Sequence, residues 1–131
     1  MAKGRVIRKR DWRHEDEAPF SGGSCADSNL DQIGWYCGNG SDMTHPVGQK
    51  LPNAWGLYDM SGNVQEWCWD WFGDYPRAVT DPVGPASGAR RVVRGGSWND
   101  YAQDCRSAAR SYADPGYRAH ALGLRPASSA P

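Results

Sequence analysis

The densest hydrophobic block of the chain, residues 54–72, constrains its fold most strongly. This block, AWGLYDMSGNVQEWCWDWF, holds four of the seven tryptophans, while Leu, Ile and Phe are scarce throughout the sequence. The core must therefore be built on tryptophan, and the 16 glycines and nine prolines indicate many loops. A length of 131 residues favours one domain.

The second half of this block has the pattern of a strand. After a turn at residues 61–63, the residues of 64–71 alternate between a tryptophan-rich set and a set containing Glu66 and Cys68. A period of two is typical of a strand, so we expect one over 64–71. Four tryptophans are expected to pack against the two faces of its sheet: Trp67, Trp69, Trp71 and Trp98.

The remaining segments are short and rich in turns. No stretch predicts a helix longer than about two turns. The expected segments are a basic tail over 1–20, a short strand or helical turn over 30–36, a Pro/Gly loop over 73–90, and strands in 90–96 and 122–127. Together they predict an α+β fold, irregular and loop-rich with a small antiparallel sheet, in a single domain over 21–131.

Charge and hydropathy exclude two classes of function. The 15 basic and 15 acidic residues give no net charge, so a uniformly basic surface for nucleic acid is not expected. No apolar run is long enough to span a bilayer, and no apolar segment follows the basic N-terminus as in a secretory signal. The compartment stays open between a phage particle, the cell surface by another route, and the cytoplasm.

The four cysteines suggest one disulfide and no zinc site. Cys25 and Cys37 bracket a short segment, so a disulfide between them would close a small loop. Cys68 lies among tryptophans, which favours a buried thiol. The sequence has no C-x-x-C pair and its three histidines are far apart, so zinc is not expected.

Residues 95–125 combine two interleaved sets of residues. The first resembles a rigid frame: Gly95, Gly96, Ser97, Trp98, Cys105, Arg106, Ser107, Arg110, Pro115, Arg118, Gly123 and Arg125. The gap positions use only Asn, Asp, Tyr, Ala, Ser, Gly and His: Asn99, Asp100, Tyr101, Asp104, Ala109, Ser111, Tyr112, Ala113, Asp114, Gly116, Tyr117, Ala119, His120 and Ala121. Every gap residue can be encoded by the asparagine codon AAC after changes at its adenines alone.

Several motifs resemble the formylglycine-generating-enzyme/sulfatase-modifying-factor family. They are GLYDMSGNVQEW at 56–67, RGGSW at 94–98 and CRSAARS at 105–111, within a similarity that covers 29–127. The resemblance implies a C-type lectin-like fold that here is truncated at the N-terminus. The strand at 122–127 would then form an open sheet edge, which we expect a second copy, a partner chain or the tail residues to cover.

The resemblance also bears on catalysis. Catalytic members of the family bind copper through two cysteines five residues apart, and here those positions hold Asp100 and Cys105. A single thiolate cannot form the bis-thiolate site that copper(I) needs. We therefore expect no copper and no enzyme activity. An oxidase of the formylglycine-generating kind and a self-assembling structural protein remain as alternatives.

Calcium is the cofactor that the resemblance implies. The family's GNxxEW segment supplies calcium ligands, which here would be the side chains of Asn63 and Glu66 and the carbonyl of Val64. The alternative is an ordinary turn in which Asn63 and Glu66 only satisfy backbone amides.

The gap pattern resembles the variable proteins of diversity-generating retroelements, which are rewritten at adenines. This implies a non-catalytic ligand-binding protein with a variable region at 98–125, although an ordinary non-catalytic family member is also possible. The expected contact residues, for a protein or other macromolecular ligand, are Asn99, Asp100, Tyr101, Asp104, Ser111, Tyr112, Asp114, Tyr117 and His120. The three tyrosines of this set are expected to supply most of the binding energy.

Overall fold

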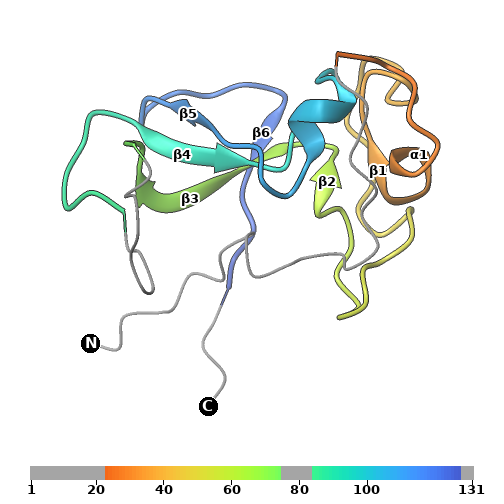
Figure 1. Ribbon diagram of the computed structural model, residues 1–131, viewed down its shortest axis with the longest axis horizontal. Helices are drawn as coiled ribbons and strands as arrows, with labels where there is room; N and C mark the ends of the chain where they lie inside the picture. The colour runs from red at the N-terminus through yellow and green to blue at the C-terminus, as the bar shows by residue number, and fades with distance from the viewer. Residues whose placement is uncertain (1–22, 75–83, 128–131) are drawn as a thin grey trace.

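The computed structural model describes residues 23–74 and 84–127 (Figure 1). The basic tail expected at 1–20 and residues 75–83 of the Pro/Gly loop lie outside these residues. The elements are α1 (Leu30–Ile33), β1 (Gly34–Trp35), β2 (Ser61–Gly62), β3 (Gln65–Trp71), β4 (Arg91–Arg94), the 3₁₀ helix η2 (Ala102–Cys105), β5 (Ser111–Ala113) and β6 (Leu122–Gly123). This arrangement confirms a loop-rich α+β fold.

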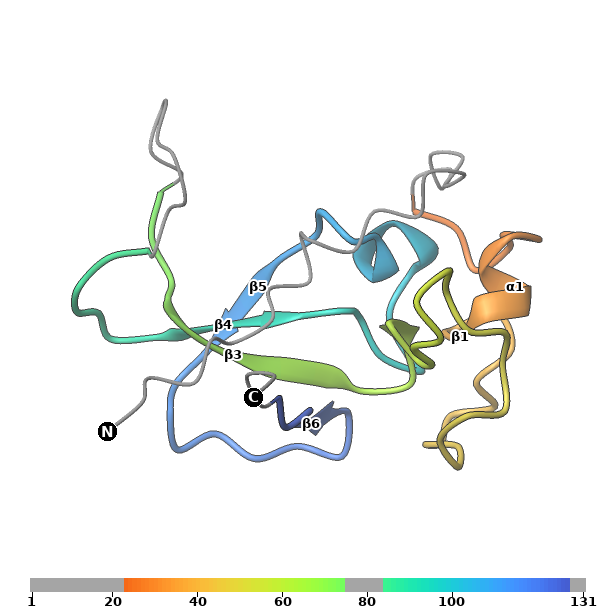
Figure 2. The same ribbon diagram turned by 90° about the horizontal axis from the view of Figure 1, so that it is seen from below.

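The main sheet has the strand order β5-β4-β3-β6. Strand β4 pairs antiparallel with both β3 and β5, whereas β6 pairs parallel with β3. The sheet is therefore mixed, and the expectation of a purely antiparallel sheet was wrong for β6. The reason is the long connection from β5, which crosses to the far edge and brings β6 in alongside β3 (Figure 2). Coverage of that edge by another chain remains a prediction.

The strand predicted over 64–71 is confirmed as β3, but its packing differs from the expectation. Trp69 is 72% exposed, so its prediction as a packing residue was wrong, and Cys68 is half-buried rather than buried. The pairing of β3 with β4 is irregular between Trp67 and Trp71, which disturbs the alternation. The guanidinium of Arg91 lies 3.5 Å from the centre of the Trp71 ring and 4.7 Å from that of Trp69.

Two glycines end β4. Gly95 and Gly96 have φ angles of +95° and +65°, a region that residues with a Cβ rarely adopt. The strand predicted over 90–96 therefore stops at Arg94. The chain then turns through Ser97 and Trp98 into η2, which places the segment that begins at residue 98 beside the sheet.

A small hydrophobic core joins the first part of the chain to η2. Its fully buried members are Leu30, Tyr36, Ala102 and Cys105, with Ile33 and Cys37 packed against them. The predicted disulfide between Cys25 and Cys37 is present, with the two Cα atoms 5.2 Å apart. Within the described ranges, no helix is long and apolar enough to cross a bilayer.

Candidate functional site

The gap positions and the frame positions of 95–125 differ in burial. None of the fourteen gap residues, all of which lie in described segments, is buried. By contrast, Gly95, Gly96, Ser97 and Cys105 of the frame are buried, as is Ala102. Of the two sets, only the frame therefore contains buried residues, although the other eight frame residues are half-buried or exposed like the gap residues.

The exposed gap residues lie along one side of the molecule. The segment runs from η2 through β5 and along the connection to β6, at the top of Figure 1, while residues 124–127 lead away below. We call the exposed side chains of 99–122 the display surface. Tyr101, Tyr112 and Tyr117 belong to it and are 51%, 46% and 57% exposed.

Of these tyrosines, Tyr112 has the most extensive contacts with the sheet. Its ring centre lies 4.6 Å from that of Phe72, and the guanidinium of Arg90 lies 4.4 Å above it. Arg90 also pairs with Asp114 at 3.5 Å. Tyr112 and Asp114 therefore have partners within the protein as well as exposed surface.

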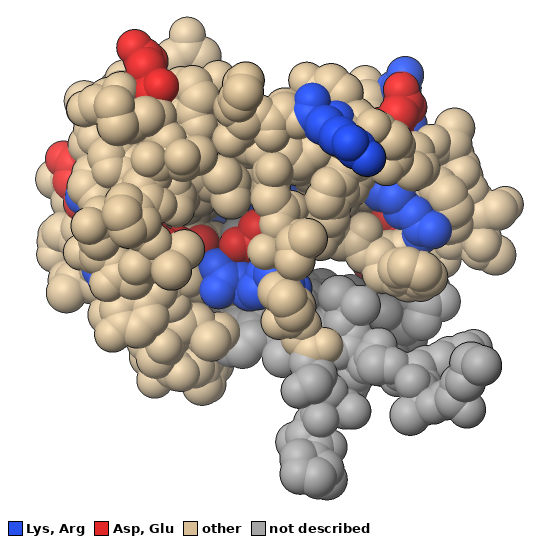
Figure 3. Space-filling model, turned by 180° about the vertical axis from the view of Figure 1, so that it is seen from behind, with Lys and Arg blue, Asp and Glu red and all other residues tan. Residues whose placement is uncertain are grey.

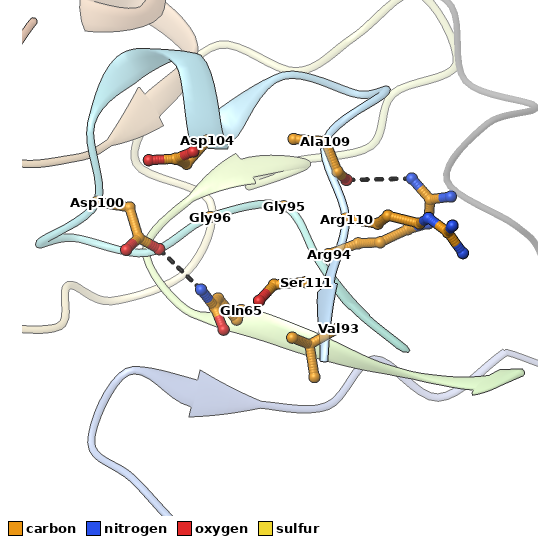
Figure 4. Close-up of a pocket in the computed structure, with 10 residues that line it drawn as sticks. All are labelled: Gln65, Val93, Arg94, Gly95, Gly96, Asp100, Asp104, Ala109, Arg110 and Ser111. Atoms are coloured by element: carbon orange, nitrogen blue, oxygen red, sulfur yellow. Dashed lines mark hydrogen bonds between the residues drawn. The ribbon is translucent and has the colours of Figure 1, made fainter. Parts of the chain in front are cut away.

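A cavity of about 250 Å³ lies under the display surface (Figure 4). Three of the nine predicted contact residues line it: Asp100, Asp104 and Ser111. The floor is formed by Gly95 and Gly96, and the acidic side chains lie at the opposite end from those of Arg94 and Arg110. The other six predicted contact residues do not line this cavity.

Asp100 is held by the frame. Its Oδ2 accepts hydrogen bonds from the Ser97 hydroxyl at 2.8 Å and from the Gln65 amide at 2.9 Å. Ser97 is almost completely buried, so this end of the cavity is fixed by polar contacts. Burial raises the pKa of the Asp104 carboxyl, and the nearby Asp100 raises it further.

This raised pKa predicts a pH-dependent effect of Asp104→Asn. A carboxyl whose pKa is higher in the folded than in the unfolded state binds its proton more tightly in the fold, so folding stability falls as pH rises through that interval. We expect Asp104→Asn to have a higher Tm than the parent at pH 7. The difference should vanish below the ordinary aspartate pKa of 3.8, where Asp104 is protonated in both states. A Tm difference that is constant from pH 3 to pH 7 would contradict the prediction.

Arg94 is a frame residue that the sequence analysis missed. Its Nη1 donates hydrogen bonds to the carbonyls of Ser107 and Ala109, at 3.2 and 3.1 Å, and so holds the loop that follows η2. Arg106 and Arg110 were both predicted as frame. Arg106 donates to the Gln103 carbonyl, and the guanidinium of Arg110 lies over the Phe72 ring. The position directly before Gly95 and Gly96 is the sequence feature that could have identified Arg94 as a frame residue.

A second cavity, of about 420 Å³, lies between β3 and the C-terminal segment. On the face seen in Figure 3, acidic and basic side chains meet in a hollow. The ion pair between Glu66 and Arg125 lines this cavity, with Nη2 to Oε1 at 2.8 Å. Arg125 also donates to the carbonyls of Tyr58 and Asp59, at 3.0 and 3.1 Å. Arg125 was predicted as frame, and these contacts give that role a physical basis.

The expected calcium ligands fit unevenly. The side chain of Asn63 exchanges two hydrogen bonds with the backbone of His45, at 2.9 and 3.0 Å, as in the alternative of an ordinary turn. Glu66 lines the second cavity, but its carboxylate accepts hydrogen bonds from Nε and Nη2 of Arg125. Asp59, which sequence reasoning missed, lines the same cavity and is 6% exposed, and its Oδ1 has no hydrogen-bond partner. Asp59 therefore fits a cation better than Asn63 does.

The two positions at which the resemblance implies copper-binding cysteines hold Asp100 and Cys105. Asp100 lines the first cavity, while Cys105 is fully buried in the small core. Among residues 23–74 and 84–127, no group of three or more His, Cys, Asp or Glu residues is arranged to hold a metal ion.

Comparisons with known proteins agree with this architecture. A solved structure, Treponema denticola variable protein 1, has a TM-score of 0.71 and 44% sequence identity, over 78% of this chain and 38% of that chain. The formylglycine-generating enzyme of Streptomyces coelicolor is 44% identical over 98 residues, which is 70% of this chain and 31% of the enzyme. The serine/threonine-protein kinase pkn1 of Chlamydia caviae is 38% identical over 83% of this chain and 20% of the kinase.

This chain spans less than a third of the length of those two curated relatives. The sequence profile of the sulfatase-modifying factor enzyme 1-like domain, however, matches residues 7–130, nearly the whole sequence. The chain belongs to this family.

Proposed function

We propose that the protein is a non-catalytic ligand-binding module that presents the display surface to a protein or other macromolecular ligand. The observation that carries the proposal is the burial pattern: none of the fourteen gap positions is buried, whereas four frame residues, Gly95, Gly96, Ser97 and Cys105, are buried. A binding surface benefits from exposed tyrosines, which give large contact areas at small entropic cost, and from small polar residues that adapt.

The similarity to Treponema denticola variable protein 1 supports the same reading. We infer that the restricted residue set at the gap positions arises from adenine-directed rewriting by a diversity-generating retroelement. Finding an adenine-rich template repeat whose adenines align with the gap codons, next to a reverse transcriptase gene, is the expected result at the locus. A locus without such a repeat would contradict this part of the proposal.

The formylglycine-generating relatives favour a second candidate, an oxidase. Against it stands the residue at position 100, since an aspartate there leaves Cys105 as the single thiol of this segment. The burial of Cys105 in the core with Leu30 and Tyr36 also favours a packing role. Oxygen consumption on a thiol peptide with copper(I) present separates the two candidates: turnover would overturn the non-catalytic proposal.

A folding test examines the display surface without any ligand. One library randomises exposed gap positions (Asn99, Tyr101, Ser111, Tyr117 and His120), and a matched library randomises buried positions of the same segment (Gly96, Ser97, Ala102 and Cys105). Surface substitutions usually change the free energy of unfolding by less than about 0.5 kcal/mol, whereas core substitutions change it by about 2–5 kcal/mol.

We therefore expect most members of the first library, and few of the second, to remain protease-resistant on a cell-surface display system. A buried substitution that costs about 2 kcal/mol or more lowers the folded-to-unfolded ratio of that variant by about 25-fold or more, since 1.4 kcal/mol corresponds to a factor of ten. Equal loss of resistance in both libraries would mean that the gap side chains are needed for folding, and would contradict a role in display.

We further propose that a calcium ion binds in the second cavity through Asp59, Glu66 and the carbonyl of Val64. The unpartnered, buried oxygen of Asp59 supports this choice of ligands. Calcium at a hundred times its Kd would stabilise the fold by about 2.7 kcal/mol, so adding it to chelator-treated protein should raise the Tm. Asp59→Asn should remove most of that rise. Magnesium at the same concentration is the control. If calcium does not change the Tm, the proposed site is ruled out.

A further inference from the structure

Tyr101 of the display surface is held between two backbone hydrogen bonds. On one side, the carbonyl of Asp100 accepts from the N–H of Cys37 at 3.1 Å. On the other side, the N–H of Ala102 donates to the carbonyl of Ser24 at 3.1 Å. Cys37 is one half of the disulfide, and Ser24 directly precedes its other half, Cys25. The two anchors of Tyr101 are thus joined to each other through the disulfide.

Further contacts join the disulfide loop to η2. The N–H of Gly23 donates to Oε1 of Gln103 at 2.5 Å. The buried Leu30 and Tyr36 of the loop pack with Ala102 and Cys105 in the small core. These contacts bring the loop over 25–37 and η2 together as one packed unit at the end of the display surface.

On its other side, the loop is held by the pairing of β1 with β2 and by the N–H of Asn63, which donates to the Trp35 carbonyl at 2.7 Å. Its helix α1 has four residues and its strand β1 has two, and neither would be stable alone. The hydroxyl of Tyr36 holds the two limbs together, accepting from the Asp27 N–H at 2.8 Å and donating to the Asp31 carboxylate at 2.9 Å. The disulfide is the covalent constraint that keeps Ser24 and Cys37 in register with 100–102.

We propose that the Cys25–Cys37 disulfide positions Tyr101, and that binding at the display surface therefore depends on the oxidised state of this pair. The second part rests on the proposed function, whereas the first does not. Cys25 is exposed, so a reductant can reach its sulfur. In the reaction, a small dithiol transfers two electrons and two protons to the disulfide; it becomes a cyclic disulfide, and Cys25 and Cys37 become thiols.

The test is amide hydrogen exchange of the full chain before and after treatment with dithiothreitol. The reporters are the N–H groups of Ala102 and Cys37, which form the two anchors. The control is the N–H of Phe72, which donates to the Arg90 carbonyl at 2.8 Å, directly beyond the paired residues Trp71 and Arg91 of β3 and β4. The other two cysteines, Cys68 and Cys105, are not in a disulfide, so the reagent changes one disulfide bond.

We expect reduction to accelerate exchange at Ala102 and Cys37 by about tenfold or more, as local opening becomes easier, while Phe72 is unchanged. Unchanged exchange at Ala102 and Cys37 would overturn the proposal. Equal acceleration at Phe72 would overturn it too, because the disulfide would then hold the whole domain rather than the Tyr101 anchors. This readout needs no ligand, so it is independent of the proposed function.

A surrogate ligand tests the second part. The probe is an antibody fragment raised against the oxidised protein, chosen because Tyr101→Ala abolishes its binding. Its affinity should fall at least about fivefold when the protein is reduced, since a loosened loop must be ordered again on binding. A fragment that recognises Val47, on the second cavity, should bind both forms equally. Equal affinity of the Tyr101-dependent fragment for both forms would contradict redox-dependent binding.

Discussion

Replacement of Gly96 by alanine is expected to lower the free energy of unfolding by about 3–4 kcal/mol, the largest effect of any single methyl group that we predict. Gly96 has a φ angle of +65°, which disfavours a residue with a Cβ by about 1–2 kcal/mol. The new Cβ would also lie 2.5 Å from Sγ and 2.9 Å from Cα of Cys105. Because one of these atoms is backbone, η2 itself must move.

Gly48→Ala is the matched control for backbone strain. Gly48 has a φ angle of +78°, but no atom lies within 4 Å of the added Cβ. It should lower stability by about 1–2 kcal/mol only, so the excess in Gly96→Ala measures the contact with Cys105. Chemical denaturation of both variants gives the two values. Equal losses would show that Gly96 is required for its φ angle alone, and that η2 is free to shift.

Gly96→Ala should also separate the frame from the display surface. The substitution displaces the backbone under Asp104 and Cys105, while the side chains of Tyr112 and Tyr117 lie on other elements. Exchange of the Ala102 amide should therefore accelerate more than that of amides in β4. This outcome would show that the glycine pair sets the position of η2.

Much of the fold could be predicted from local patterns. The alternation around Trp67 predicted β3, and the spacing of Cys25 and Cys37 predicted the disulfide. The exposure of the gap positions also agreed with the sequence, because the residue set that identified them is one suited to a solvated surface. Each of these features depends on residues close together in the chain.

The features that escaped prediction depend on contacts between distant segments. The parallel pairing of β6 with β3 joins Leu122 to Gln65, which no local pattern encodes. The exposure of Trp69 depends on where other segments of the fold lie relative to β3. The alternation of residues along β3 carries no information about those segments. Asn63 was assigned to calcium because of its place in a motif, whereas its partner in the structure, His45, lies 18 residues away.

The candidate site shows the same division. Sequence reasoning predicted nine contact residues, of which three line the cavity beneath the display surface. Arg94 was missed because the carbonyls that it binds are brought to it only by the fold. Asp59 was missed because the cavity that it lines is formed by segments far apart in the sequence. Residue type thus predicted accessibility better than it predicted which side chains meet.

The ion pair between Arg125 and Glu66 provides the second large effect. Arg125→Ala should lower the free energy of unfolding by about 3 kcal/mol, because it leaves a buried carboxylate without its two-pronged partner. The glutamate side chain is only 12% exposed, so water replaces the lost bonds poorly. The carbonyls of Tyr58 and Asp59 also lose their hydrogen bonds to the guanidinium. For a domain of this size, a loss of about 3 kcal/mol lowers the Tm by about 10 °C.

Arg90→Ala is the matched control. It removes the ion pair with Asp114, whose side chains are 49% and 74% exposed, and should change stability by less than about 1 kcal/mol. Arg125→Lys keeps the positive charge but cannot form the same fork, so it should recover only part of the loss. Calorimetry on the three variants and the parent measures the loss of stability in each. If Arg125→Ala were no more harmful than Arg90→Ala, the ion pair would be dispensable, and the pairing of β6 with β3 would be enough to hold the C-terminal segment.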